Sequence, residues 1–172
     1  MGPVTMPHVQ LALSSYGYKL DFESIVLTMQ MKAAPRRVAG PRALVLEEAP
    51  AEMSHDGMRE SWTGFEPMWT RGLVADEQVG QVGWVMLSQV SEKLGAPCLN
   101  IWSLGVSREQ RRHGIGLALV EEAMRRGFAM GARFCSVGTQ LWNAPAHATY
   151  AAAGFRPHCI VLGRKLTPTD GA

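Results

Sequence analysis

A short run of arginine and glycine residues has the composition of a phosphate-binding turn. Its members are Arg111, Arg112, His113, Gly114, Ile115 and Gly116. Glycine has no Cβ, so an anion can approach the backbone closely there, and φ can turn positive without steric cost. If a helix starts at this run, its unpaired N–H groups and the positive end of its dipole also favour an anion. The competing interpretation is an ordinary glycine turn with solvated arginines.

Two better-known phosphate loops do not fit this run. A Walker A loop needs Gly-Lys-Ser/Thr, which is absent here, and a dinucleotide-binding fingerprint needs a third glycine where this chain has Leu119. The run is therefore an Arg-x-x-Gly-x-Gly pattern, and its function depends on the elements on either side.

Hydrophobic periodicity predicts those elements. Residues 99–106 are densely apolar, which is typical of a central strand covered on both faces. After the run, apolar residues recur at spacings of three or four, and these are Leu117, Val120, Met124 and Phe128. That period predicts a helix with one buried face. The run thus lies between a buried strand and the start of a helix.

The rest of the chain predicts further strands and a second helix. Residues 134–139 fit a strand, and residues 144–153 fit a helix with Asn143 as its N-cap and Gly154 at its end. Residues 159–166 fit a last strand. Earlier in the chain we predict a strand at 43–46, a short helix near 51–61, a hairpin of residues 68–75 and 79–87, and a loop at 91–97.

Two segments resemble motifs of the GNAT superfamily of acetyl-CoA-dependent N-acetyltransferases. Residues 104–119, Leu-Gly-Val-Ser-Arg-Glu-Gln-Arg-Arg-His-Gly-Ile-Gly-Leu-Ala-Leu, resemble the acetyl-CoA-binding motif. Residues 143–155 resemble the Asn-x-x-Ala-x-x-x-Tyr-x-x-x-Gly-Phe element of that family. The two motifs occur in the family's order with a predicted strand between them, and the whole resemblance covers about residues 68–166.

The resemblance implies a fold and a set of cofactor contacts. The implied fold is α/β (α+β), with a mixed, mostly antiparallel twisted sheet, splayed central strands and flanking helices. The implied acetyl-CoA contacts are Leu104 and Val106 for the pantetheine arm, Arg111, Arg112, His113, Gly114, Ile115 and Gly116 for the pyrophosphate, and Asn143. An ordinary helix cap is the alternative for Asn143.

Tyr150 lies where the family often has a general acid for the departing thiolate. Its phenol is neutral at physiological pH and can donate a proton. The alternative is a tyrosine that only packs on its helix. The general base is not visible: some family members have a glutamate at the position of Asn100, and an asparagine cannot accept a proton at useful pH. Glu60, Glu66 or a chain of waters remain open as the base.

The acceptor region departs from the family pattern. GNAT proteins usually have two helices between their first and second strands, and residues 50–67 leave little chain for both. Three aromatic residues in or just after this segment fit either an acceptor pocket or ordinary core, and these are Trp62, Phe65 and Trp69. We expect an N-acetyltransferase that moves the acetyl group of acetyl-CoA to a primary amine in a ternary complex. A small molecule is the first choice of acceptor, a protein amine the second, and a non-catalytic acyl-CoA-binding regulatory module the rival class.

Composition limits the other function classes. The chain has 172 residues, 47% of them hydrophobic and 19% charged, which is typical of one globular domain. No apolar run approaches the length of a membrane span, no secretory signal is visible, and a net charge of +2 gives no reason to expect nucleic acid. Cys98, Cys135 and Cys159 show no zinc-ligand or disulfide pattern, so we expect no metal, three buried reduced thiols and a cytoplasmic location.

The amino-terminal part of the chain is predicted to lie outside the acetyltransferase domain. We divide the chain into an extension and linker at residues 1–41, containing a strand or hairpin, and an acetyltransferase domain at residues 42–172. Alternating residues around Leu20 and an apolar segment at 25–31 predict a strand, which we expect to join the sheet or a partner chain in a homodimer. Gly17-Tyr18 before Ile25-Val-Leu loosely repeats Gly154-Phe155 before Ile160-Val-Leu. A remnant of a degenerate repeat and an ordinary hairpin both remain open.

Overall fold

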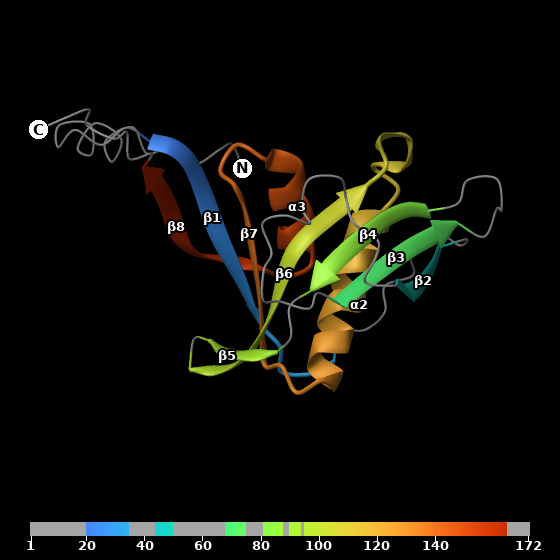
Figure 1. Ribbon diagram of the computed structural model, residues 1–172, viewed down its shortest axis with the longest axis horizontal. Helices are drawn as coiled ribbons and strands as arrows, with labels where there is room; N and C mark the ends of the chain where they lie inside the picture. The colour runs from blue at the N-terminus through green and yellow to red at the C-terminus, as the bar shows by residue number, and fades with distance from the viewer. Residues whose placement is uncertain are drawn as a thin grey trace, which may run out of the picture.

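The described part of the chain forms one sheet, and the helices α2 and α3 pack on one of its faces (Figure 1). The computed structural model describes residues 20–34, 44–49, 68–74, 81–87, 90–93 and 95–164. The strands are β1 (Leu20–Gln30), β2 (Leu44–Ala49), β3 (Met68–Val74), β4 (Gln81–Leu87), β5 (Ser91–Lys93), β6 (Ala96–Val106), β7 (Phe134–Gln140) and β8 (Arg156–Arg164). The helices are the 3-10 turn η2 (Arg108–Gln110), α2 (Ile115–Ala129) and α3 (Ala144–Ala152).

The sheet has eight strands in the order β2-β3-β4-β6-β7-β1-β8, with β5 paired to β6 outside this path. Among the described strands only β6 and β7 are parallel, and every other neighbouring pair is antiparallel. The predicted fold class, a mixed and mostly antiparallel sheet with flanking helices, is confirmed.

The two central strands separate after a short paired stretch. On β6 the pairing with β7 runs from Cys98 to Ile101, opposite Phe134 to Val137 of β7. Beyond it, β6 continues along β4 as far as Val106, whereas β7 follows β1 (Figure 1). The predicted splay is therefore present. It starts after Ile101 and Val137.

A β-bulge lies on β6 where the splay begins. Leu87 of β4 pairs with Ile101 and Met86 pairs with Ser103, so Trp102 is the extra residue. Trp102 is exposed. The bulge reverses the alternation of side chains, so Leu104 packs against the core although it is an odd number of residues from Ile101.

The strand β1 lies inside the sheet, between β7 and β8. The predicted strand near Leu20 is thus confirmed, and its place in the sheet is the structural result. Ile25, Leu27 and Met31 are buried in the core. Ile25 lies directly opposite Ile160 of β8, so the two segments of the suspected repeat are antiparallel neighbours. The repeat itself stays a prediction.

Helix α2 starts and ends where the sequence predicts. Gly114 is the N-cap with φ 80°, and Gly131 follows the C-cap with φ 94°. The buried face is wider than the predicted stripe, because the helix lies across both β4 and β6. Val120 and Met124 are buried as expected, whereas Leu117 and Phe128 are half-buried. The remaining buried positions are Ile115, Ala118, Leu119, Glu122, Ala123 and Gly127.

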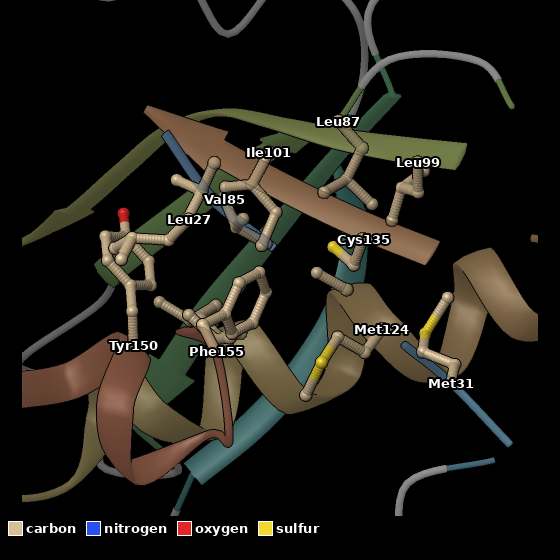
Figure 2. Close-up of a cluster of buried hydrophobic side chains, with 14 of the residues drawn as sticks. Leu27, Met31, Val85, Leu87, Leu99, Ile101, Met124, Cys135, Tyr150 and Phe155 are labelled. Carbon is tan, nitrogen blue, oxygen red and sulfur yellow. The ribbon is translucent and has the colours of Figure 1, made fainter. Parts of the chain in front are cut away.

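The core fills the space between the sheet and these helices (Figure 2). Tyr150 enters the core from α3, Phe155 from the residue just before β8, Met124 from α2, and Leu27 from β1. The face of the sheet opposite α2 and α3 is called the far face below. Successive side chains of a strand alternate between the two faces.

Three sequence-based predictions need correction. Cys159 is exposed rather than buried, because it pairs with Val26 and so lies on the far face of β8, the last strand of the sheet. Cys98 and Cys135 are buried free thiols, as predicted. The loop predicted at 91–97 contains β5, which folds back onto β6 around Gly95 with φ 74°. The last strand begins at Arg156, three residues earlier than predicted.

The other predicted strands are confirmed, and part of the acceptor region lies outside the described residues. β2 matches the predicted strand at 43–46, and β3 and β4 form the predicted antiparallel hairpin. The predicted helix near 51–61, together with Glu60, Glu66, Trp62 and Phe65, lies outside the described residues, as does the side chain of Trp69. No described helix is long and apolar enough to cross a membrane.

Candidate active site

The turn between β6 and α2 contains two residues in the left-handed conformation. Gly114 has φ 80° and Arg112 has φ 70°. A side chain other than glycine rarely adopts such a φ, so Arg112 is strained. Arg111, Arg112 and His113 are exposed, whereas Ile115 is buried and fixes the helix start in the core. Because the N-cap is glycine, it offers no side chain to the first N–H groups of α2.

Hydrogen bonds hold this turn against the ends of β4 and β6. Ser107 Oγ donates to the carbonyl of Val82 at 2.8 Å, and the Ser107 N–H donates to the same oxygen at 2.9 Å. Arg111 Nε donates to the carbonyl of Val106 at 3.1 Å. The turn is therefore preorganised, and the guanidinium of Arg111 is held beside the last residue of β6.

Gly116 lies where three elements of the site meet. An ideal Cβ placed on it would lie 3.7 Å from Val106 Cγ2 at the end of β6 and 3.7 Å from Thr149 Cγ2 on α3. These are ordinary van der Waals distances, so the packing of the protein does not require glycine here. The fold thus brings together the two sequence motifs, one ending β6 and starting α2, the other forming α3.

Asn143 is the N-cap of α3. Its side-chain oxygen accepts a hydrogen bond from the Ala146 N–H at 3.3 Å, which confirms the predicted cap. His147 Nε2 lies 3.1 Å from the carbonyl of Gln140, the last residue of β7. The His147 contact, together with the Asn143 N–H, which donates to the same carbonyl at 3.0 Å, fastens the start of α3 to the end of β7.

Tyr150 is 5% exposed and points from α3 toward the sheet (Figure 2). Its ring centroid lies 5.8 Å from that of Phe155. Burial among apolar side chains, and to a lesser extent the neighbouring thiol of Cys135, raise the pKa of Tyr150 to about 12. The hydroxyl makes no hydrogen bond to any other described residue. Tyr150 is thus a protonated donor at neutral pH.

A hydrogen-bonded chain crosses β6 and β7 on the far face. Cys98 Sγ lies 3.6 Å from Ser136 Oγ as a donor, and Ser136 Oγ donates to Asn100 Oδ1 at 2.8 Å. Asn100 and Ser136 are in register, one position before the strands part. The sequence drew attention to Asn100, because of its match to a glutamate, but not to Ser136. Only the register between the strands identifies that partner.

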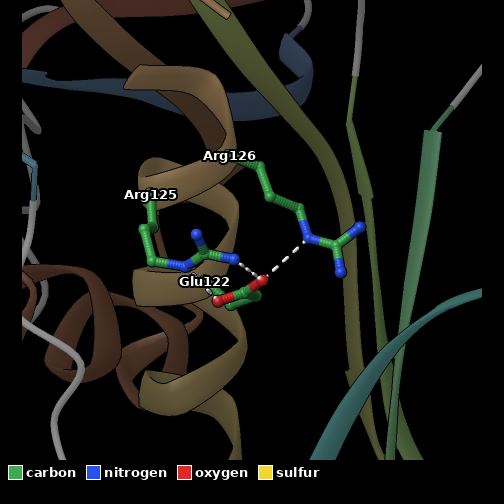
Figure 3. Close-up of polar contacts among 3 residues, drawn as sticks. All are labelled: Glu122, Arg125 and Arg126. Atoms are coloured by element: carbon green, nitrogen blue, oxygen red, sulfur yellow. Dashed lines mark hydrogen bonds and ion pairs between the residues drawn. The ribbon is translucent and has the colours of Figure 1, made fainter. Parts of the chain in front are cut away.

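The buried carboxylate of α2 is engaged by two arginines (Figure 3). Arg125 donates to both oxygens of Glu122 at 2.8 and 2.6 Å, and Arg126 Nε donates at 2.8 Å. Burial by itself raises the pKa of Glu122, but the hydrogen bonds and charges of the two arginines outweigh it, so that pKa is lowered. Glu122 is therefore a structural carboxylate and not a candidate base.

The described residues contain no cluster of three or more His, Cys, Asp or Glu side chains that could hold a metal ion. The functional candidates are instead the uncapped start of α2, the separated strands and Tyr150.

Comparison with protein-family models finds a match over about two thirds of the chain. A model of the Acetyltransferase (GNAT) family matches residues 41–155. No match was found among curated proteins.

Several solved structures share the fold. A GCN5-related N-acetyltransferase from Sphaerobacter thermophilus has a TM-score of 0.63 at 16% identity, over 94% of this chain and 56% of that one. One from Kribbella flavida has a TM-score of 0.63 at 14% identity, over 91% and 62%. A tandem GNAT protein from the clavulanic acid biosynthesis pathway has a TM-score of 0.59 at 19% identity, over 94% and 58%. This chain thus spans less than two thirds of the length of these structures.

Proposed function

Because the chain belongs to the GNAT acetyltransferase family, we propose that it moves the acetyl group of acetyl-CoA to a primary amine. Family and fold support acetyl transfer in general, and the acceptor is our own inference. A small-molecule amine is the first choice and a protein amine the second. The observation that carries the proposal is the junction at Gly116, where the end of β6, the start of α2 and the helix of Tyr150 meet.

The residues of this junction fit the cofactor. Residues 111–116 would hold the pyrophosphate through the N–H groups at the start of α2 and the exposed charges of Arg111 and Arg112. The backbone of Leu104 and Val106, on the part of β6 that has left β7, would pair with the pantetheine arm. Asn143 would contact the same arm from α3. A thioester bound there supplies an activated acetyl carbonyl.

Direct attack by a neutral amine requires a proton donor for the departing sulfur. Tyr150 meets this need, because it is protonated at neutral pH and its hydroxyl has no partner among the described residues. Its pKa of about 12 lies well above that of an ordinary thiol, about 8.5. Donation should therefore accompany the departure of the sulfur rather than precede it.

The amine must also lose a proton. Asn100 cannot accept one, and Glu122 is held by two arginines. We propose that the proton leaves through water or through Glu60 or Glu66, which lie outside the described residues. We further propose that the protein works in the cytoplasm as a homodimer, with acetyl-CoA and the amine as partners and without nucleic acid.

A non-catalytic acyl-CoA-binding module is the second candidate. Asn100 favours it, because an amide cannot act as the general base where some family members have a glutamate. A thiol-release assay with acetyl-CoA and a panel of small amines and amino-terminal peptides tests both. Thiol release that depends on an amine supports the enzyme. Tight binding of acetyl-CoA without release on any amine would favour the module.

A further inference from the structure

Beyond the point where the central strands part, β7 has lost β6 as a neighbour. Residues Gly138 to Gln140 pair with Val26, Ile25 and Ser24 of β1. Within the described part of the chain, β1 is the only strand paired with β7 there. One side of the proposed cofactor cleft is therefore held in place by the amino-terminal strand.

The lack of a side chain at Gly138 makes β7 more dependent on this pairing. Gly138 has nothing within 4 Å of where its Cβ would stand, so it adds no packing of its own. A glycine inside a strand also weakens the strand. At Gly138 the position of β7 thus depends on its backbone pairing with β1.

The same strand contacts the end of α3. A Cβ placed on Gly154 would lie 3.2 Å from Met29 Sδ of β1, so strand and turn are closely packed. Leu27 is buried in the cluster that contains Tyr150 (Figure 2). β1 therefore pairs with the β7 side of the cleft and packs against the turn that follows the helix bearing the proposed proton donor.

From these contacts we infer that β1 sets the opening between β6 and β7, so that an element outside the family match at residues 41–155 is a working part of the cofactor cleft. This inference rests on the proposed binding of acetyl-CoA. It goes beyond the expectation that the amino-terminal strand only joins the sheet or a partner chain. Val26 is the central positioning residue, because it pairs with Gly138 at the first position after the strands part.

Two matched substitutions on β1 test the inference. Val26→Gly weakens β1 where β7 has no other described neighbour. Thr28→Gly weakens it where its partner Ser136 is still paired with Asn100 of β6. Both residues are β-branched and half-buried, and both lie on the far face. The two changes should therefore lower the melting temperature by similar amounts.

Coenzyme A binding by calorimetry and amide hydrogen exchange at residues 138–140 are the readouts. Because strand propensities differ by about 1 kcal/mol, Val26→Gly should speed exchange at these amides about fivefold and weaken coenzyme A at least about threefold. Thr28→Gly should leave both close to wild type. Equal effects of the two variants, or none for Val26→Gly, would overturn the inference. If the glycine variants do not fold, Val26→Ala and Thr28→Ala make the same comparison.

The exchange measurement separates this inference from the proposed function. If wild-type protein does not bind coenzyme A, the proposed function fails, while selective exchange at residues 138–140 in Val26→Gly would still support the role of β1 in holding β7. If coenzyme A binds but exchange and affinity respond alike to both variants, the proposed function stands and the role of β1 is wrong.

Discussion

Ser136 donates a hydrogen bond of 2.8 Å to Asn100 across β6 and β7, one position before the two strands part. Toward their carboxyl ends the two strands share only one further pair, Ile101 with Val137. The hydrogen bond therefore links β6 to β7 on the far face, next to the point where the two strands begin to separate. Because it occupies the amide oxygen of Asn100, it also fixes which way that amide points.

Removing this donor should destabilise the protein. Ser136→Ala leaves the oxygen of Asn100 without its hydroxyl partner, and because this hydrogen bond is only partly buried its loss should cost about 1 kcal/mol. Urea unfolding measures this cost. In a double-mutant cycle with Asn100→Ala, the two changes should be coupled by about 0.5 kcal/mol or more. Strict additivity would mean that the bond contributes nothing to stability.

Local signals were sufficient to predict the elements of the site. An apolar segment before Gly114 and a period of three to four after it located β6 and α2. Asn143 and Gly154 located the two ends of α3, because an N-cap and a left-handed C-terminal glycine are read from single positions. These features depend on neighbours in sequence, so the sequence alone predicted them.

Long-range features could not be predicted in the same way. The alternation near Ile25 indicated a strand but not that it lies between β7 and β8, since the pattern of one strand does not specify its neighbours. Ser136 was missed for the same reason. The positive φ of Arg112 was missed because arginine rarely adopts it, and only the fold imposes that conformation.

Replacing Arg112 by glycine should raise stability and weaken cofactor binding. Arg112→Gly removes a side chain from φ 70°, so the free energy of unfolding should rise by about 1 kcal/mol. The same change removes a charge beside the proposed pyrophosphate site and should weaken coenzyme A. Calorimetry and thermal melting on one preparation measure both. Arg108→Gly is the control, because its conformation is ordinary and that variant should lose stability. A destabilised Arg112→Gly would contradict the strain argument.

The two glycines of the turn should respond differently to alanine. Gly116→Ala meets only contacts of 3.7 Å inside the first turn of α2, so stability should be unchanged or rise by about 0.5–1 kcal/mol. Gly114→Ala must adopt φ 80° and should lose about 1–2 kcal/mol. Both should weaken coenzyme A, since each methyl group narrows the approach to the N–H groups. Unchanged affinity in folded Gly116→Ala would exclude this turn as the pyrophosphate site.

Glu122 should make stability depend on pH in the acid range. Its pKa in the folded protein is lowered by Arg125 and Arg126, so its stabilising effect is full above the unfolded value of roughly 4.3 and is lost as pH falls through the folded value. Glu122→Gln should therefore be less stable than wild type at neutral pH and lose less stability on acidification. Unfolding at a series of pH values tests this, with exposed Glu109→Gln as control. Parallel curves for wild type and Glu122→Gln would refute it.

Replacing Tyr150 by phenylalanine should lower turnover and leave stability nearly unchanged. Tyr150→Phe keeps the buried ring and its contact with Phe155, and the hydroxyl that it removes has no partner among the described residues. The free energy of unfolding should therefore change by less than about 0.5 kcal/mol, below the roughly 1 kcal/mol of a lost hydrogen bond. If the hydroxyl donates to the departing sulfur, kcat should fall by about a hundredfold to ten-thousandfold with little change in coenzyme A binding.

The pH profile gives a second test of Tyr150. With a pKa of about 12, the phenol stays protonated through the neutral and mildly alkaline range, so it should not cause a fall in kcat below about pH 11. Tyr16→Phe makes the same chemical change elsewhere in the chain and controls for general effects. Thiol release under conditions where the chemical step limits the rate measures kcat for all three proteins. Near-normal kcat in Tyr150→Phe would remove this residue from the mechanism and assign it to packing alone.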